Sequence, residues 1–282
     1  MENAYSETMQ ILKKYKITAN KNLGQNFLIN DEVIEKIIEG ARVQTDDLVI
    51  EIGPGLGTLT SRLLQKAGKV LAIEIDNRMV NILKGRFENI QNLEILQEDV
   101  LKVDLKKKIE QEGFKTVKVV ANLPYYITTP IIMKLLEENL KLESITVMVQ
   151  KEVADRLVAK PGEKNCGAIT CAVYYYSEAQ KIVEVPKESF IPSPEVTSEV
   201  IKLNIRNEAP INVKNKETLF KIIKAAFMQR RKTISNSLMN TGFWKDKQEL
   251  INTLDGLQIS QKARAEELTL EQFAAITNEI DK

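Results

Sequence analysis

Residues 48–75, LVIEIGPGLGTLTSRLLQKAGKVLAIEI, contain two short apolar runs on either side of a glycine-rich turn and a helical stretch. The runs 48–53 and 70–75 are typical of buried strands in a parallel sheet, which read as continuous apolar segments. A helix over 59–66 makes a right-handed βαβ crossover the expected connection between them. This stretch therefore predicts an α/β fold with a mostly parallel sheet.

The same alternation continues along the chain. Further strands are expected at 93–97, 117–122 and 144–150, and further helices after Asp31 and at 77–87, 130–138 and 151–159. Extended stretches near 169–185 and 198–205 then complete a seven-stranded sheet, with the last strands partly antiparallel.

The pattern changes after the last expected strand. Residues 216–280 read as helical and contain no convincing strand, and NEAPIN (207–212) is the expected boundary. We expect an α/β domain over 1–207, in which 1–45 precede the sheet, and a small all-helical domain over 208–282.

Composition excludes several kinds of chemistry. The 282 residues include no histidine, which removes a His general base, a Ser/His or Cys/His pair and every His-containing metal site. Cys166 and Cys171 are too few for a disulfide framework or a four-thiolate zinc site, so no metal is expected. The net charge is +1, and the sequence shows neither a signal peptide nor an apolar run of about 20 residues. We expect a cytoplasmic monomer that does not contact membranes.

The glycine-rich turn lies where the first strand meets its helix. Gly53 and Gly55 allow the backbone to approach a ligand closely. A dinucleotide fingerprint requires a third small residue at the position that Thr58 occupies, so that pattern fails by one residue. The alternative is a tight turn that binds nothing.

Acidic residues end the next two strands. Glu74 can accept hydrogen bonds from both hydroxyls of a ribose, and Asp99 can accept from the exocyclic amine of a purine. Each acid alone is more simply a solvated loop residue. Because the carboxyl ends of neighbouring strands converge, the two acids and the glycine turn together outline an adenosine site without a phosphate anchor. That combination indicates S-adenosylmethionine.

The motif Asn122-Leu123-Pro124-Tyr125 follows the fourth strand. The proline makes the turn stiff, so the Asn122 side-chain oxygen and a carbonyl of the turn can both accept from one NH2 group, with Tyr125 flat against its ring. Two acceptors localise the lone pair of an adenine N6, which is otherwise delocalised into the ring, without a strong base. The alternative is a proline turn that only closes a strand.

A second aromatic group is expected on the other face of an extruded base. Phe190, in a loop that Pro192 and Pro194 stiffen, is the candidate for this position. The alternative is that Phe190 is a hydrophobic plug beneath that loop.

These motifs resemble those of the small-subunit rRNA adenine N6-dimethyltransferase family. The matching segments are NLGQNFL (22–28), VIEIGPGLGTLT (49–60), AIEID (72–76), EDV (98–100), ANLPYYITTP (121–130), MVQKEVADR (148–156), FIPSPEVTSEV (190–200) and AFMQRRKTISNSL (226–238). The resemblance implies a Rossmann-like class I methyltransferase domain with a helical C-terminal domain. It also implies S-adenosylmethionine-dependent dimethylation of two adjacent adenines in the 3′-terminal hairpin of small-subunit rRNA during ribosome assembly.

The resemblance also implies which residues touch the cofactor. By motif position these are Asn26, Leu28, Gly53, Glu74, Asp99 and Asn122. The role of QNFL (25–28) as a flap over the cofactor follows from the family alone.

A basic stretch in the C-terminal part is the candidate RNA contact. Between Ile211 and Ser235 there are seven Lys or Arg and one acid, and the rest of the chain has a net charge of −5. The residues expected to bind phosphates are Lys221, Lys224, Arg230, Arg231 and Lys232. A solvated helix face is the alternative. The expected partner is small-subunit rRNA or the immature small subunit.

Other functions remain open at this stage. A large-subunit rRNA dimethyltransferase of the macrolide-resistance type shares the site chemistry, although Leu123 and the long C-terminal part favour the small-subunit enzyme. A DNA adenine methyltransferase more typically has a Pro-Pro pair at this motif. A non-catalytic RNA-binding assembly factor would be expected to lack Asn122 or Tyr125, and a dinucleotide oxidoreductase is the most distant alternative.

Overall fold

The computed structural model describes residues 3–20, 23–229 and 231–280. Arg230, one of the expected RNA contacts, lies outside the described residues. The described chain divides into two compact units. The sheet unit comprises the residues up to Ala154 together with Ala179–Ile205, and the helical unit comprises Asp155–Glu178 and the residues from Arg206 onward.

A seven-stranded sheet is formed by the described residues, which confirms the expected α/β fold. Its order is β4 (Leu93–Gln97), β3 (Lys69–Glu74), β2 (Asp47–Ile52), β5 (Thr116–Asn122), β6 (Ser144–Gln150), β9 (Ser198–Ile205) and β7 (Ser177–Val185). The first five strands are parallel, whereas β9 pairs antiparallel with β6. The strands that follow β2 in the chain are added first on one side of it, as β3 and β4, and then on the other side, as β5 and β6. Ligands of such sheets bind at the carboxyl ends of the strands, near the point where the strand order changes side.

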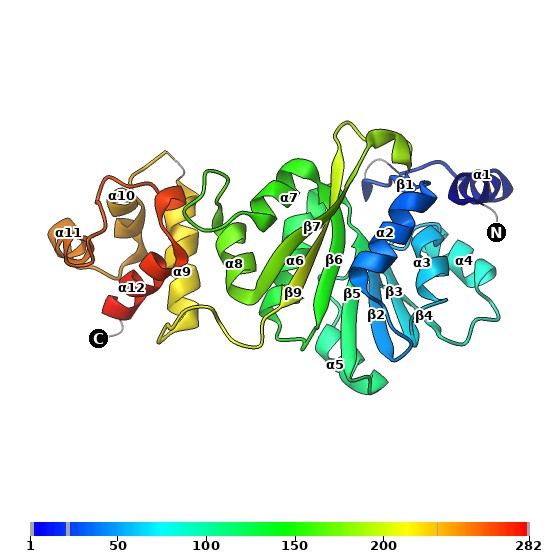
Figure 1. Cartoon of the computed structure of the whole chain (residues 1–282), viewed down its shortest axis with the longest axis horizontal. Coiled ribbons are helices and arrows are strands. Elements are labelled where there is room, and N and C mark those ends of the chain that lie inside the picture. The colour runs from blue at the N-terminus through cyan, green and yellow to red at the C-terminus, as the bar shows by residue number, and fades with distance from the viewer. Residues whose placement is uncertain (1–2, 21–22, 230, 281–282) are drawn as a thin grey trace. The chain divides into compact units, whose positions relative to one another are not determined.

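Helices lie on both faces of the sheet (Figure 1). They are α2 (Asp31–Ala41), α3 (Thr58–Leu63), α4 (Asn77–Arg86), α5 (Leu105–Glu112) and α6 (Thr128–Glu137), followed by α7 (Lys151–Val158). The side chain of Asn30 caps α2 by accepting from the Val33 N–H, and α2 packs against β5, β6 and β9. Every residue of β2 is buried, as expected for a strand covered on both faces.

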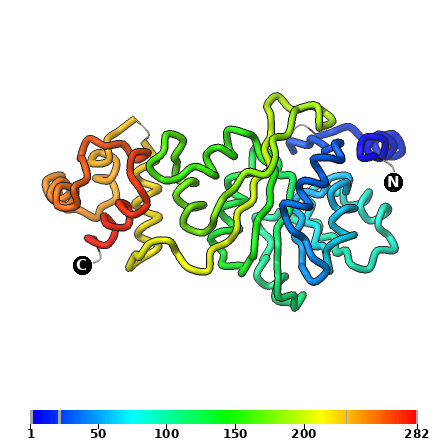
Figure 2. Tube along the Cα trace, in the orientation of Figure 1, coloured from blue at the N-terminus to red at the C-terminus, as the bar shows by residue number. Residues whose placement is uncertain are grey.

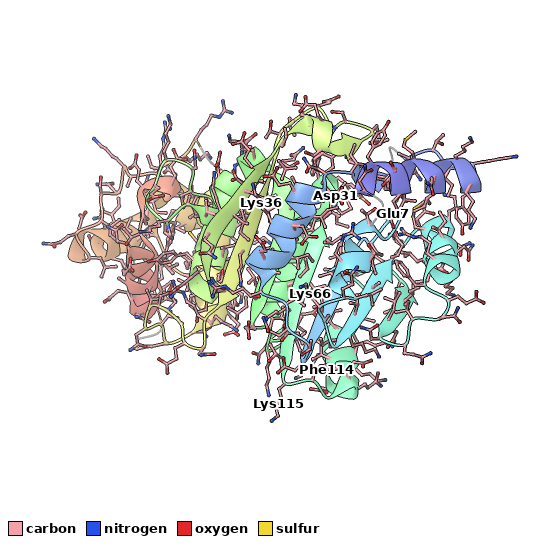
Figure 3. All side chains as sticks on the ribbon, turned by 45° about the vertical axis from the view of Figure 1, so that its right-hand side comes forward. Glu7, Asp31, Lys36, Lys66, Phe114 and Lys115 are labelled. Atoms are coloured by element: carbon pink, nitrogen blue, oxygen red, sulfur yellow. The ribbon has the colours of Figure 1, made fainter. Side chains whose placement is uncertain are left out.

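An N-terminal helix, α1 (Ala4–Tyr15), packs against α3, and the sequence patterns did not predict it. Its buried residues are only Ala4, Thr8 and Ile11, which is too narrow an apolar stripe to recognise. Glu7 and Asp31, labelled in Figure 3, tie α1 to its surroundings. Glu7 pairs with Arg86, and Asp31 Oδ2 accepts from the Ala4 N–H at 3.0 Å.

A two-residue strand, β1 (Phe27–Leu28), pairs antiparallel with β8 (Phe190–Ile191), which is distant in sequence. Figure 2 shows the N-terminal trace returning to meet the yellow-green segment around residue 190. This pairing holds Phe27 and Leu28, the last residues of the segment 23–28 that precedes α2, against β8.

The helical unit has its own core. Its helices are α8 (Ala168–Tyr176), α9 (Lys216–Met228), α10 (Ile234–Leu238), α11 (Lys247–Gly256) and α12 (Leu270–Ile280). Short 3-10 turns of this unit occupy Met239–Thr241 and Ala265–Glu267, and a further one, Lys187–Ser189, belongs to the sheet unit. Cys166 and Cys171 are buried in this core.

The expected strand near 169–185 is only partly correct, because residues 168–176 form α8 and only 177–185 form a strand. The run CAVYYY (171–176) has strand-like composition, but its aromatic rings pack on α9. Tyr176 stacks on Phe220 with ring centroids 5.6 Å apart, and Tyr175 meets the same ring edge-on at 5.3 Å. Packing within the helical unit therefore overrides local propensity.

Candidate active site

The carboxyl ends of β2, β3 and β5 surround a cavity that encloses about 1120 Å³ of empty space, part of it open solvent. Its walls are residues 23–28, the glycine turn, the ends of β3 and β4, and the turn after β5. These segments meet because parallel strands deliver their carboxyl ends to one edge.

The glycine turn adopts the conformation that its composition predicts. Gly53 and Gly55 have φ values of 69° and 57°, in the left-handed region that other residues avoid. A Cβ on Gly55 would lie 3.5 Å from the Phe27 ring, so residues 23–28 lie directly against this turn.

Glu74 is held rigidly at the end of β3. Its Oε2 accepts from the Gly55 N–H at 3.1 Å, and its Oε1 accepts from the Asp76 N–H at 2.8 Å. Burial raises the pKa of this carboxyl, although the backbone donors oppose the effect. Each carboxylate oxygen retains a lone pair, so Glu74 can still accept from a ligand.

Asp99 lies beyond β4 and lines the same cavity. Its Oδ1 accepts from the Leu101 N–H at 3.0 Å, which fixes the orientation of the carboxylate.

The turn after β5 is fixed by contacts on each of its residues. Asn122 Nδ2 donates to the Asn26 carbonyl at 3.2 Å, and the Tyr125 hydroxyl lies 2.6 Å from the Ser198 hydroxyl. The carbonyl of Pro124 accepts from the Ile127 N–H at 3.2 Å and from the Thr128 hydroxyl at 3.1 Å. Tyr125 begins a 3-10 turn, η2 (Tyr125–Ile127), and burial raises the pKa of its phenol.

The structure brings most of the expected site residues to this one cavity. They are Asn26, Leu28, Gly53, Gly55, Glu74, Asp99, Asn122, Pro124 and Tyr125.

Phe190 is not among the residues that line the cavity. Its side chain is 3% exposed and packs in the hydrophobic core with Leu28 and Val33. Its stacking against an extruded base stays a prediction, and the hydrophobic plug stays the alternative.

The four described residues of the expected RNA contact lie in the helical unit. Lys221 and Lys224 are exposed on α9, and Arg231 and Lys232 are exposed just after it. No residue of this set lines the cavity in the sheet unit.

Glu51 and Tyr126 also line the cavity without having been expected there, and Gln25 belongs to the QNFL segment that was expected to cover the cofactor. Glu51 is 1% exposed, its Oε2 has no hydrogen-bond partner among the described residues, and burial raises its pKa to about 8. Because Glu51 lies two residues before Gly53, at the end of the first strand, its sequence position could have placed it at the cavity. Tyr126 is 60% exposed, and Gln25 donates to Asp76 Oδ2 at 2.9 Å. No local pattern marks Gln25.

The charges of the lining constrain its ligand. The described residues around the cavity include Glu74, Glu98 and Asp99 but no Lys or Arg, and Glu51, with its pKa of about 8, is protonated at neutral pH. An acidic lining favours a positively charged ligand and disfavours a pyrophosphate. Among the described residues no group of three or more acids or cysteines could hold a metal ion.

No helix in the described part of the chain is both long and apolar enough to span a bilayer.

Comparison with known proteins identifies relatives along almost the whole chain. The family model described as ribosomal RNA adenine dimethylase matches residues 16–282. "Ribosomal RNA small subunit methyltransferase A" of Lachnoclostridium phytofermentans is 47% identical over 279 residues, which are 98% of this chain and 96% of the relative. The protein of the same name from Clostridioides difficile is 45% identical over 280 residues, covering 99% of this chain and 96% of that protein.

Solved structures agree with this assignment. A dimethyladenosine transferase from Plasmodium falciparum has a TM-score of 0.75 at 27% identity, covering 90% of this chain and 97% of that one. The 23S rRNA methyltransferase ErmE has a TM-score of 0.68 at 25% identity, covering 91% and 100%.

Proposed function

This chain belongs to the ribosomal RNA adenine dimethylase family, and we propose that it dimethylates N6 of two adjacent adenines in the 3′-terminal hairpin of small-subunit rRNA. The observation that carries the proposal is the rigid Asn122–Tyr125 turn beside an acidic cavity, around which the described residues include no basic side chain. The methyl donor is S-adenosylmethionine, which supplies a methyl group on a positively charged sulfur.

The cavity residues fit this donor. Glu74 has lone pairs available for the two ribose hydroxyls, and Asp99 has one for the adenine amine. The backbone at Gly53 and Gly55 leaves room for close approach, and Leu28 supplies apolar contact. The carboxyl groups of the lining stabilise a positive charge in the cavity.

The turn after β5 binds and orients the target amine. Because Asn122 Nδ2 is engaged by Asn26, its Oδ1 is left to accept from the N6 protons. Both lone pairs of the Pro124 carbonyl are occupied, so the second acceptor of the turn is the carbonyl of Leu123. Two acceptors shift N6 toward sp³ geometry and localise its lone pair. The hydrogen bond between Tyr125 and Ser198 holds the phenol ring in place to stack on the base.

The RNA is bound through its phosphates. Lys221, Lys224, Arg231 and Lys232 are exposed, and such side chains provide affinity that depends on salt and not on sequence. We propose that Arg230 belongs to the same set.

The large-subunit enzyme remains the second candidate because the ErmE fold matches over 91% of this chain. Relatives named for the small subunit are nearly twice as similar in sequence, at 47% against 25%. The small-subunit target is therefore favoured.

The test is to incubate the protein with small ribosomal subunits that lack the modification and with a labelled methyl donor, and to map the labelled nucleotides. We expect label on two adjacent adenines of the 3′-terminal hairpin and none with Asn122→Ala. Label confined to large-subunit RNA, or absent from all RNA, would contradict the proposal.

A further inference from the structure

One hydrogen bond joins the turn after β5 to a segment far away in the sequence. Asn122 Nδ2 donates to the carbonyl oxygen of Asn26, in residues 23–28, which we call the N-terminal flap. The flap lines the cavity along its whole length.

This bond decides which atom of the Asn122 amide faces the cavity. A carbonyl oxygen can only accept, so the Asn26 carbonyl holds the NH2 end of the Asn122 side chain and leaves Oδ1 turned away from the flap. An amide rotated by 180° would place two acceptors against each other at the flap. It would also present an NH2 donor to an amine that needs an acceptor.

We propose that the backbone carbonyl of Asn26 is a positioning group for methyl transfer. By selecting one orientation of the Asn122 amide, it makes closure of the flap a condition for activating the target amine. This inference rests on the proposed function. The flap then does more than cover the cofactor, because an enzyme with its flap displaced can hold both substrates and still lack an aligned acceptor.

The flap is attached differently at its end and over the cavity. Its end is anchored by β1 and by the Ile29 N–H, which donates to the Ser189 carbonyl at 2.9 Å. Over the cavity, Gln25 Nε2 donates to Asp76 Oδ2 at 2.9 Å, next to the Asn26 contact. Asp76 is also paired with Arg78 at 2.7 Å, so removing the Gln25 amide does not leave a buried carboxylate without a partner.

Tyr126 provides a second contact near this point. A Cβ on Gly24, whose φ is 60°, would lie only 3.3 Å from Cδ1 of the Tyr126 ring. The flap therefore touches the turn after β5 twice, through the Asn122 amide and through this ring.

The Gln25 contact allows the flap to be loosened without altering any group that meets the amine. Gln25→Ala removes the bond to Asp76 and the bond that Gln25 Oε1 accepts from the Asn20 N–H at 2.9 Å, and it leaves Asn122, Leu123 and Tyr125 unchanged. The control is Gln65→Ala, the same substitution at a glutamine whose side chain donates to the Ser61 carbonyl on α3 and does not line the cavity.

The experiment has two readouts on the full-length protein. The first is the single-turnover rate of methyl transfer to small-subunit RNA at saturating cofactor and RNA. The second is the hydrogen-exchange protection of the Asn122 side-chain NH2, observed by NMR on protein labelled at asparagine and assigned with Asn122→Asp.

We expect Gln25→Ala to lower the saturating rate about tenfold or more, because the flap loses two hydrogen bonds that each contribute about 1 kcal/mol, and to speed exchange of the Asn122 NH2. RNA affinity and the Gln65→Ala control should match the wild type. If the flap were only a cover, Gln25→Ala would raise the KM for the cofactor and leave the saturating rate unchanged, which overturns the inference. Unprotected Asn122 NH2 protons in the wild type overturn it as well.

Failure of the proposed function gives a different result. A wild type that methylates no RNA contradicts the function, whereas the NMR readout still reports on the contact between Asn26 and Asn122.

Discussion

The two ends of β5 each carry a polar side chain, buried at Lys118 and half-buried at Asn122, and the hydrogen-bonding groups of the two are satisfied in opposite ways. At the amino end, Lys118 Nζ lies 2.8 Å from Asp47 Oδ2 and donates to the Arg42 carbonyl at 2.8 Å. At the carboxyl end, Asn122 makes one hydrogen bond through its NH2 and turns its oxygen toward a cavity. Buried groups whose capacity is filled by protein hold a fold together, and a buried group with unused capacity marks where a ligand binds.

Glu51 and Asp47 repeat this contrast on the neighbouring strand, β2. Asp47 is ion-paired with Lys118 and also accepts from the Gln44 N–H at 2.7 Å. Glu51 is equally buried, and its Oε2 has no partner in the described chain. On β2, therefore, the carboxylate at the amino end has protein partners, and one oxygen of the carboxyl at the other end has none.

Asn122→Ala gives the sharpest test of this contrast and the largest expected effect. Removing the acceptor should lower methyl transfer at least 10²–10³-fold, the range found when a group that stabilises developing charge is deleted. RNA affinity should change little, and stability should fall by only about 1 kcal/mol, the contribution of the hydrogen bond from Asn122 Nδ2 to the Asn26 carbonyl. Radiometric methyl transfer and filter binding to the same RNA measure both quantities. Retained turnover would remove Asn122 from the mechanism.

Lys118→Met should have the opposite effect, with a large loss of stability and little change in methyl transfer. It leaves Asp47 buried without its cation, which typically destabilises a protein by about 3–5 kcal/mol. Activity per folded molecule should remain near that of the wild type, because Lys118 does not line the cavity.

Urea unfolding provides the measurement for Lys118→Met, and Lys36→Ala is its control. The pair between Lys36, labelled in Figure 3, and Glu32 is exposed. Such pairs contribute less than about 1 kcal/mol. Equal stability losses for the two variants would show that the amino end of β5 is not the structural counterpart of its carboxyl end.

The convergence of the site could be predicted from sequence because it depends on one regular property of parallel sheets. Glu74, Asp99 and Asn122 each end a strand, so an apolar run followed by a polar residue was sufficient to place them together. The expected strands at 93–97 and 144–150 match β4 and β6 for the same reason.

What could not be predicted depends on contacts between distant segments. β8, which contains Phe190, pairs with β1 more than 160 residues earlier in the chain, and no pattern near either strand specifies that partner. The role of Asn26 in holding the Asn122 amide is likewise invisible, because a backbone carbonyl leaves no signature in the sequence. The helix α5 was missed because its buried residues are only Leu105 and Ile109.

Glu51, the buried carboxyl of β2 whose Oε2 has no partner among the described residues, makes the unfolding free energy depend on pH. Its pKa is about 8 in the folded protein against 4.5 for an exposed glutamate, so the folded state holds this proton more tightly than the unfolded state. Stability from this group is complete below about pH 4.5, falls as the unfolded chain ionises, and stops falling above about pH 8.

Glu51→Gln should therefore flatten the pH dependence of the unfolding free energy between pH 5 and 8. As the pH rises, the unfolding free energy of the variant should increase relative to that of the wild type, by on the order of 1 kcal/mol per pH unit at most. Urea unfolding at intervals across that range gives the comparison. Parallel curves for the two proteins would mean that Glu51 is ionised in the folded state and has a partner in solution.

The exposed basic residues of the helical unit form a third class, and they give the smallest expected effect. Arg231 and Lys232 are exposed, so their contribution to RNA binding depends on charge and not on a fixed geometry. Replacing both with Ala should reduce the slope of log affinity against log salt by about 1–2, because each phosphate contact contributes about 0.7–0.9. The saturating rate of methyl transfer should not change, and Lys245→Ala with Lys247→Ala serves as a charge-matched control after α10. If the slope is the same in all three proteins, the RNA phosphates are bound elsewhere on the chain.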